Sequence, residues 1–328
     1  MVEIDYILAG ICILLSFFVT LFLTKFWIRV AKKIGLTGKD MNKVDSRQIP
    51  EAGGIAVIFG FVFGLFTYIF FKIFYLNSQT HLILVFATIC SVLLACFLGF
   101  IDNILGWKKG LRQWQKPLLT LPIAIPLMII NAGHSTLSIP LLGPVDFGLL
   151  YPLLIVPLGI VGAANGFNIL AGFNGLEAGM GAVILSFLGI VAWFHQLPWI
   201  TLIAFCAVMA LLGFLAFNWY PARVFPGDAL TYAIGTLIAI LAILGSMEKL
   251  AIILFIPYFI ELVFDLKTKF KKECWGTPQK DGSLKPPEKA TSLAHVLMKF
   301  FKTEKSIVAA LLSIEVLLGV GALAIFYL

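Results

Sequence analysis

Long apolar runs, separated by short polar breaks, dominate the chain. A helix that crosses a membrane needs about 20 predominantly apolar residues, and the runs between polar or Gly/Pro breaks approach or reach that length. We therefore predict about ten membrane-spanning helices. Their expected ranges are 4–30, 52–76, 82–102, 116–131, 150–170, 178–195, 199–217, 228–246, 249–266 and 304–328.

The composition supports this fold class. Of the 328 residues, 60% are hydrophobic and only 12% are charged, whereas a soluble domain has about 25% charged residues. We predict an all-α integral membrane protein, a polytopic helical bundle with catalytic loops on the cytoplasmic face. The whole chain, 1–328, is expected to be one domain, with 267–303 as the loop between the last two helices.

Basic residues indicate the orientation of the bundle. Ten alternating spans place the loops 31–51, 103–115, 171–177, 218–227 and 267–303 on one side. That side holds almost all the loop cations, whereas the other side holds only Lys72 and Lys249. The positive-inside rule then makes the basic loops cytoplasmic and places both termini outside. Since topology accounts for the net charge of +7, we expect no nucleic-acid partner.

Cysteine and histidine patterns give no support to zinc or Ser-His-Asp chemistry. The five cysteines and four histidines are dispersed, with no CxxC or HExxH spacing.

Three polar clusters stand at the predicted cytoplasmic boundary. They occur in "FLGFIDNILGWKKGLRQWQK", "NGFNILAGFNGLEAG" and "FNWYPARVFPGD". Their candidate functional residues are Asp102, Asn103, Lys116, Asn165, Asn168, Asn174, Glu177, Arg223, Phe225 and Asp228.

Each of these residues also has an ordinary structural interpretation. Asp228 could cap the N-terminus of a helix, and Asp102 could be a charge at a helix end that reaches water. Phe225 could lie at the bilayer interface. Asn165 and Asn168 could bond neighbouring helices. Ionisable residues at membrane depth nevertheless favour a functional site, and here several converge on one layer.

The residue types favour phosphate chemistry. Carboxylate and amide oxygens suit Mg2+, which often shares its ligands with substrate phosphates, and Lys and Arg offset phosphate charge. The clusters therefore indicate phosphoryl transfer at the inner membrane surface, with Mg2+ as the cofactor and Mn2+ as the alternative.

The motifs "NGFNILAGFNGLEAG", "FNWYPARVFPGD" and "FLGFIDN" resemble those of the polyprenyl-phosphate N-acetylhexosamine-1-phosphate transferases. Within that superfamily they are most similar to the dolichyl-phosphate GlcNAc-1-phosphate transferases of eukaryotes and archaea. This resemblance implies that dolichyl or another polyprenyl phosphate attacks the β-phosphorus of UDP-GlcNAc. The products would be dolichyl-diphosphate-GlcNAc and UMP, in the first step of lipid-linked oligosaccharide assembly for N-glycosylation. It also implies a homodimer, for which the sequence itself gives no support.

The resemblance assigns roles to individual positions. It implies Asn168 and Asp228 as metal ligands, Lys116 as a phosphate contact, and Asp102 as the residue that positions or deprotonates the lipid phosphate. Asp102, Asn103, Lys116 and Asp228 form the predicted catalytic set. Phe225 would stack on uracil, Asn174 would bond the base, and Glu51, in "IPEAGG", matches a nucleotide-side acidic position. The predicted substrate-binding set is Glu51, Asn165, Asn174, Glu177, Arg223 and Phe225.

Two departures from the family pattern concern the mechanism and the sugar. The usual pair of aspartates is here Asp102-Asn103, and an amide cannot accept a proton as a base. The last loop reads "KKECWGTPQKDGSLKPPEK" where relatives have an Arg-His-Arg cluster. Another UDP-N-acetylhexosamine or polyprenyl phosphate therefore remains an alternative.

Two other functional classes also remain open. A non-catalytic scaffold would be compatible with both departures. A transporter would need polar residues across the membrane and inverted repeats, and neither is evident in the sequence.

Overall fold

The computed structural model describes the chain except for residues 1–5, 46, 106–114, 140–142, 272 and 328. Four predicted cytoplasmic cations, Lys108, Lys109, Arg112 and Lys272, lie outside the described residues.

The protein is an integral membrane protein built mainly from helices. Within the described residues, seven helical segments are long and apolar enough to cross a membrane. They are α1 (Tyr6–Ile34), α2 (Gly54–Phe74), α3 (Leu82–Leu105), η2 with α6 (Tyr151–Ile155 and Val156–Ile169), α7 (Leu176–Phe194), α8 (Pro198–Asn218) and α13 (Glu304–Tyr327).

The other three predicted spans are shorter or broken, so the described residues do not form ten full-length spans. The range 116–131 becomes α4 (Gln115–Thr120), the 3-10 turn η1 (Leu121–Ala124) and α5 (Ile125–Ile129). Pro122 and Pro126 lie in the first turns of η1 and α5, where the lack of an N–H interrupts a longer helix. The range 249–266 divides at Phe255 into α10 (Glu248–Leu254) and α11 (Ile256–Lys267). The remaining helix, α9 (Asp228–Leu244), has 17 residues.

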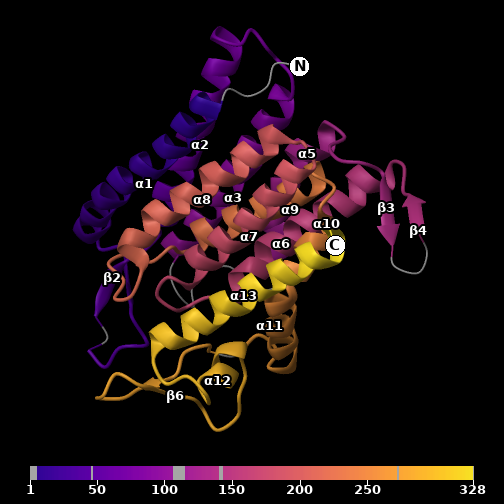
Figure 1. The fold of residues 1–328 in the computed structure, drawn as a ribbon. Helices are drawn as coiled ribbons and strands as arrows, with labels where there is room; N and C mark the ends of the chain where they lie inside the picture. The colour runs from indigo at the N-terminus through magenta and orange to yellow at the C-terminus, as the bar shows by residue number, and fades with distance from the viewer. Residues whose placement is uncertain (1–5, 46, 106–114, 140–142, 272, 328) are drawn as a thin grey trace.

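Short β-hairpins correct the all-α prediction locally. The strands β1 (Thr37–Lys39) and β2 (Gln48–Pro50) pair antiparallel in the first predicted cytoplasmic loop. A second hairpin, β3 (Thr136–Ile139) with β4 (Gly143–Asp146), projects from the side of the bundle (Figure 1). The third, β5 (Thr277–Pro278) with β6 (Leu284–Lys285), precedes the short helix α12 (Leu293–Leu297) in the last loop.

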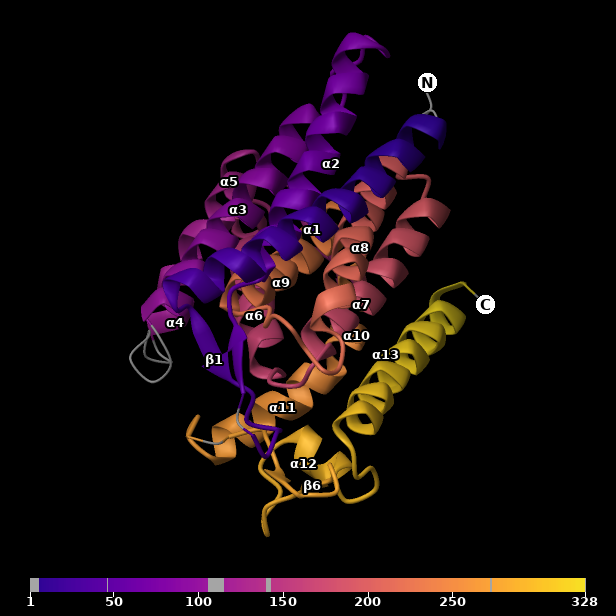
Figure 2. The ribbon, with the colours of Figure 1, turned by 90° about the vertical axis from the view of Figure 1, so that its left-hand side faces the viewer.

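The first and third hairpins gather with α12 at one end of the bundle. Figure 2 shows β1, α11, α12 and β6 at the end away from the N-terminus. The predicted cytoplasmic loops 31–51 and 267–303 thus lie at the same end of the molecule.

Helix α9 forms the centre of the core, because every residue from Ala229 to Leu244 is buried. Glycines allow its neighbours to approach closely. A Cβ at Gly99 of α3 would collide with the backbone of Asp228, and one at Gly235 of α9 would collide with the Ala163 carbonyl of α6. Close packing of α3 on α9 brings Asp228 beside the end of α3, where Asp102 lies.

Candidate active site

A cavity of about 1,880 Å³ opens at this end of the bundle and continues between the helices. All five predicted cytoplasmic loops contribute to its wall, with Asp40, Asn103, Gly172, Pro226 and Trp275 as one example from each. Segments distant in sequence therefore meet around one space.

The first feature of the cavity is a lysine between two carboxylates. Lys116 Nζ lies 2.8 Å from Asp102 Oδ2 and 3.3 Å from Asp228 Oδ2. Asp102 comes from the end of α3, Lys116 from the start of α4 and Asp228 from the start of α9. Three of the four predicted catalytic residues are thus in direct contact.

The fourth, Asn103, holds the start of α9. Its Oδ1 accepts a hydrogen bond from the Ala229 N–H at 3.2 Å, one of the free donors of the first helical turn. Gly227 has a φ of +68°, and a Cβ there would lie 2.5 Å from Asn103 Oδ1. The Pro-Gly-Asp turn therefore needs glycine both for its backbone conformation and for contact with Asn103.

Two predicted amides lie on the α6 wall of the cavity. Asn168 Oδ1 accepts from the Thr231 hydroxyl at 2.9 Å, and Thr231 stands one turn after Asp228 on α9. Asn165 Nδ2 donates to Thr120 Oγ1 and to the Val161 carbonyl, both at 2.8 Å. The first contact brings the two predicted metal ligands to neighbouring positions, and the second ties α6 to α4.

The segment before α2 runs beside the motif that contains Phe225. The Phe225 N–H donates to the Pro50 carbonyl at 2.7 Å, and the Gly53 N–H donates to the Phe225 carbonyl at 2.8 Å. Glu51 lies between these contacts and lines the cavity, as does Phe225. Burial raises the pKa of Glu51, so this carboxyl keeps its proton to a higher pH than a solvated glutamate.

Glu177 lies behind the glycine-rich loop. Its Oε1 accepts from the Gly172 N–H at 2.9 Å, while its buried Oε2 has no hydrogen-bond partner among the described residues. Glu177 also lines the cavity. The free oxygen is therefore an acceptor beside the cavity that a ligand or water could satisfy.

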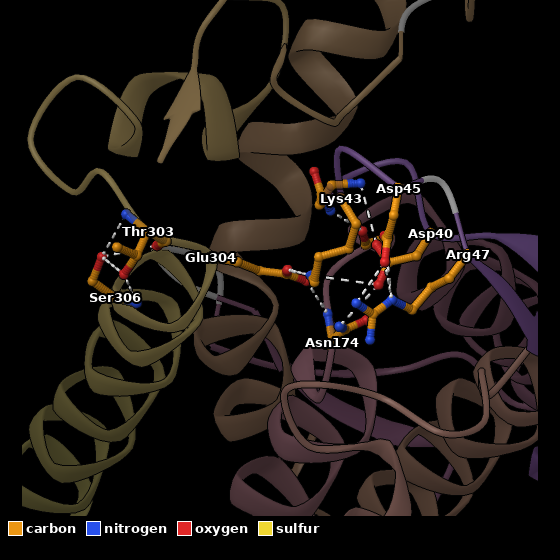
Figure 3. Close-up of polar contacts among 10 residues, drawn as sticks. Asp40, Lys43, Asp45, Arg47, Asn174, Thr303, Glu304 and Ser306 are labelled. Atoms are coloured by element: carbon orange, nitrogen blue, oxygen red, sulfur yellow. Dashed lines mark hydrogen bonds and ion pairs between the residues drawn. The ribbon is translucent and has the colours of Figure 1, made fainter. Parts of the chain in front are cut away.

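Asn174, predicted to contact the base, belongs to a buried network at the edge of the site (Figure 3). Its backbone N–H donates to Glu304 Oε1 at 2.8 Å, and its Nδ2 donates to Asp40 Oδ2 at 3.2 Å. Lys43 pairs with Glu304 and lies 3.4 Å from Asp40 Oδ2. These contacts tie the glycine-rich loop to the β1–β2 loop and to α13.

Arg223, the other predicted substrate-binding residue outside the cavity lining, faces a different side. Its Nη2 donates to the Ala216 carbonyl at 3.1 Å, and its guanidinium carbon lies 4.8 Å from the centre of the Phe217 ring. The structure thus brings together in the cavity all the predicted site residues except Asn174 and Arg223.

Comparison with known proteins places this geometry in a family. Residues 85–246 match the family model described as glycosyl transferase family 4. Over 316 residues, 94% of both chains, the sequence is 40% identical to a Saccharolobus solfataricus protein named "Putative UDP-N-acetylglucosamine–dolichyl-phosphate N-acetylglucosaminephosphotransferase". The chain belongs to glycosyltransferase family 4.

Similarity extends to family 4 proteins of eukaryotes and bacteria. This glycosyltransferase is 28% identical to the UDP-N-acetylglucosamine–dolichyl-phosphate N-acetylglucosaminephosphotransferase of Dictyostelium discoideum, over 74% of this chain and 67% of that one. It is 32% identical to the phospho-N-acetylmuramoyl-pentapeptide-transferase of Halalkalibacterium halodurans, over 79% and 84% of the two chains. The family resemblance of the sequence motifs is thereby confirmed.

The donor chemistry of the family 4 site fits a divalent cation. Asp228 and Asn168 present a carboxylate and an amide oxygen to the cavity, and Asp102 presents a second carboxylate. Oxygen donors of this kind suit Mg2+, which usually keeps waters and substrate phosphates among its ligands. Within the described part of the chain, no group of three His, Cys, Asp or Glu side chains could hold a metal.

Sequence patterns missed two hydroxyls of this glycosyltransferase. Thr231 bonds Asn168, and Thr120 bonds Asn165. The position of Thr231, three residues after Asp228 and hence on the same helix face, was an available signal. No sequence signal pointed to Thr120, because its contact with Asn165 depends on how α4 packs on α6.

Proposed function

We propose that the protein transfers GlcNAc-1-phosphate from UDP-GlcNAc to dolichyl phosphate or another polyprenyl phosphate. The products are the lipid-linked diphosphate-GlcNAc and UMP, and the reaction is the first step of lipid-linked oligosaccharide assembly for N-glycosylation. The names of the Saccharolobus and Dictyostelium relatives supply the two substrates.

One feature carries the proposal: the cavity joins a charged end to an apolar groove. The charged end holds Lys116 between Asp102 and Asp228. The groove continues past Leu158 of α6, Ile243 of α9 and Phe259 of α11. A lipid phosphate needs this combination, because its headgroup is anionic and its chain is long and apolar.

The proposed chemistry is a displacement at phosphorus. An oxygen of the lipid phosphate attacks the β-phosphorus of UDP-GlcNAc, the bond from that phosphorus to the bridging oxygen breaks, and UMP leaves. Lys116 offsets phosphate charge, and Asp102 orients the lipid phosphate or accepts its proton. Such catalysis depends mainly on positioning and electrostatic stabilisation.

Asp228 and Asn168 would hold Mg2+, with Mn2+ as the alternative ion. The cation would neutralise charge that develops on the diphosphate. Phe225 and Glu51 line the cavity beside the end of β2. The nucleotide would bind along this part of the wall. The basic loops support a cytoplasmic active site, and both termini are then proposed to lie outside.

A related UDP-N-acetylhexosamine or polyprenyl phosphate is the second candidate substrate, because the last loop differs from the family pattern. Lys271 lines the cavity from the last loop, where the family has an Arg-His-Arg cluster. A lysine offers a point charge without the planar fork of arginine. Another UDP-N-acetylhexosamine would use the same reaction.

Release of UMP by the purified protein in detergent tests the function. We expect release from UDP-GlcNAc only when dolichyl phosphate and Mg2+ are both present, and we expect EDTA to abolish it. Chromatography of the lipid fraction should show an equimolar lipid-linked diphosphate sugar.

UMP release without the lipid product would contradict transfer and would indicate hydrolysis. Turnover only with another UDP-N-acetylhexosamine would replace the sugar while keeping the reaction. If a panel of UDP-sugars and polyprenyl phosphates gives no turnover by folded protein, the scaffold interpretation replaces the enzyme.

The groove predicts a separate effect on lipid use. A Cβ at Gly162 of α6 would meet no atom within 4 Å, and Gly162 lines the groove. Gly162→Leu should fill this space without strain and raise the KM for dolichyl phosphate about tenfold. The KM for UDP-GlcNAc should remain unchanged, as initial rates at varied concentrations of each substrate would show.

Gly321→Leu is the matched control, because Gly321 of α13 also has open space around it and does not line the cavity. An equal effect of both variants on the lipid KM would exclude the groove as the lipid site.

A further inference from the structure

A second hollow, of about 370 Å³, lies beside the Ile34 end of α1. Three segments form it: the last turns of α1, Arg47 with the strand β2, and the stretch 217–223, which begins in the last turn of α8. Its floor is apolar, with Ile49 and Ala222 buried beneath it. We call it the basic hollow.

Cations from all three segments surround the basic hollow. Its lining contains five of them: Lys25, Arg29, Lys32, Arg47 and Arg223. No Asp or Glu belongs to the described lining. Asp45 pairs with Arg47 at 2.6 Å and offsets that one charge, whereas the other four cations have no carboxylate partner among the described residues.

The α1 residues form one stripe that runs from apolar to basic. Lys25, Arg29 and Lys32 follow helical spacing, so they share one face. Phe22 and Phe26 precede Lys25 and Arg29 by three residues on that face, and their side chains are 72% and 55% exposed. An apolar surface facing lipid therefore leads directly into the basic hollow.

Ordinary causes explain only part of this arrangement. The positive-inside rule and the helix dipole both favour cations at the end of α1. Neither requires Arg47 and Arg223, from distant parts of the chain, to converge on the same space. Like charges that converge repel one another unless an anion lies between them.

We propose that the basic hollow binds the phosphate headgroup of an anionic phospholipid, whose acyl chains lie along Phe22 and Phe26. Phosphate suits arginine and lysine donors, and the exposed phenylalanines supply the apolar contact. The site is separate from the large cavity of the candidate active site, and among the described residues the two linings share only Gln48. Arg223, which was predicted to bind the substrate, would here contact the lipid phosphate instead.

Lipid retention in native mass spectrometry tests this site without any turnover. The purified chain is equilibrated in micelles that contain equal amounts of phosphatidylglycerol and phosphatidylcholine. We expect wild type to retain phosphatidylglycerol preferentially. The triple variant Lys25→Gln, Arg29→Gln and Lys32→Gln should retain one fewer molecule per chain, since each lost cation weakens binding about fivefold.

The matched control removes three cations that line neither space: Lys33→Gln, Lys267→Gln and Lys299→Gln. It should retain phosphatidylglycerol like wild type, and thermal unfolding should be the same for all three proteins. Equal loss in both triple variants, or no loss in either, would overturn the proposal.

Inorganic phosphate separates a lipid from a free anion. At matched ionic strength, phosphate should not displace the retained phosphatidylglycerol any better than chloride does. Displacement by phosphate alone would assign the basic hollow to a soluble phosphate and overturn the lipid assignment.

Discussion

Asp228→Asn is expected to lower turnover about 100- to 1,000-fold, the usual range for loss of one group that stabilises transition-state charge. Asparagine has the same shape, so α9 should still begin at the Pro-Gly turn. What disappears is the negative charge 3.3 Å from Lys116, together with one of the two proposed metal ligands. Initial UMP release at saturating substrates measures the effect.

Mg2+ titration distinguishes the metal role of Asp228 from a general electrostatic role. If Asp228 is a ligand, the variant should need a higher Mg2+ concentration for half-maximal rate. Asp281→Asn is the control, because Asp281 bonds only its own turn at Ser283 and lies outside the cavity. Wild-type turnover by Asp228→Asn would remove Asp228 from the catalytic set.

Lys116→Met should lower both stability and turnover. It leaves Asp102 and Asp228 without the cation between them, and breaking such a buried pair costs about 3–5 kcal/mol of unfolding free energy. The variant should therefore unfold at a lower temperature in detergent. Turnover should fall by at least about 100-fold, since the same ammonium is the proposed phosphate contact.

A double variant tests whether charge is the cause. Lys116→Met combined with Asp102→Asn removes the charge of one of the two carboxylates that have lost Lys116, so it should recover part of the lost stability but no turnover. Lys249→Met, an exposed lysine at the other end of the bundle, controls for the substitution itself. No difference in unfolding temperature between Lys116→Met and wild type would contradict the pairing.

The sequence patterns predicted most of the polar residues that meet around the cavity, because these residues belong to short local motifs. Asp102, Lys116 and Asp228 are polar residues at the ends of apolar runs, and such residues are costly in lipid. Their convergence follows from the alternation of spans. The family motifs added the reaction, which residue types alone could not specify.

The partners of individual side chains could not be predicted from the sequence motifs. Asn174 and Arg223 occur in the family motifs, yet the fold directs one to Asp40 and the other to the Ala216 carbonyl. Asp40 is distant from Asn174 in sequence, and the Arg223 contact with Ala216 depends on the turn after α8. A motif identifies a residue type, whereas tertiary packing decides which space the side chain enters.

The predicted helix boundaries were least accurate where proline interrupts a helix, because hydropathy does not register the missing backbone N–H. Pro122 and Pro126 inside the span expected at 116–131 predict a kink, and the structure goes further by dividing the span into separate short helices at these prolines. The hairpin β1–β2 lies in a polar loop with no period-2 hydrophobic pattern, so its strand pairing could not be predicted from alternation.

The cavity lining has an electrostatic imbalance that affects how substrates arrive. Its described residues include eight carboxylates and only three lysines, Lys39, Lys116 and Lys271. Along this described wall, a magnesium-complexed nucleotide diphosphate would meet less repulsion than a free one, because the complex carries less negative charge. The described carboxylates would therefore attract cations to the cavity, and the ion atmosphere gathered there would favour entry of the donor as its metal complex over the bare anion.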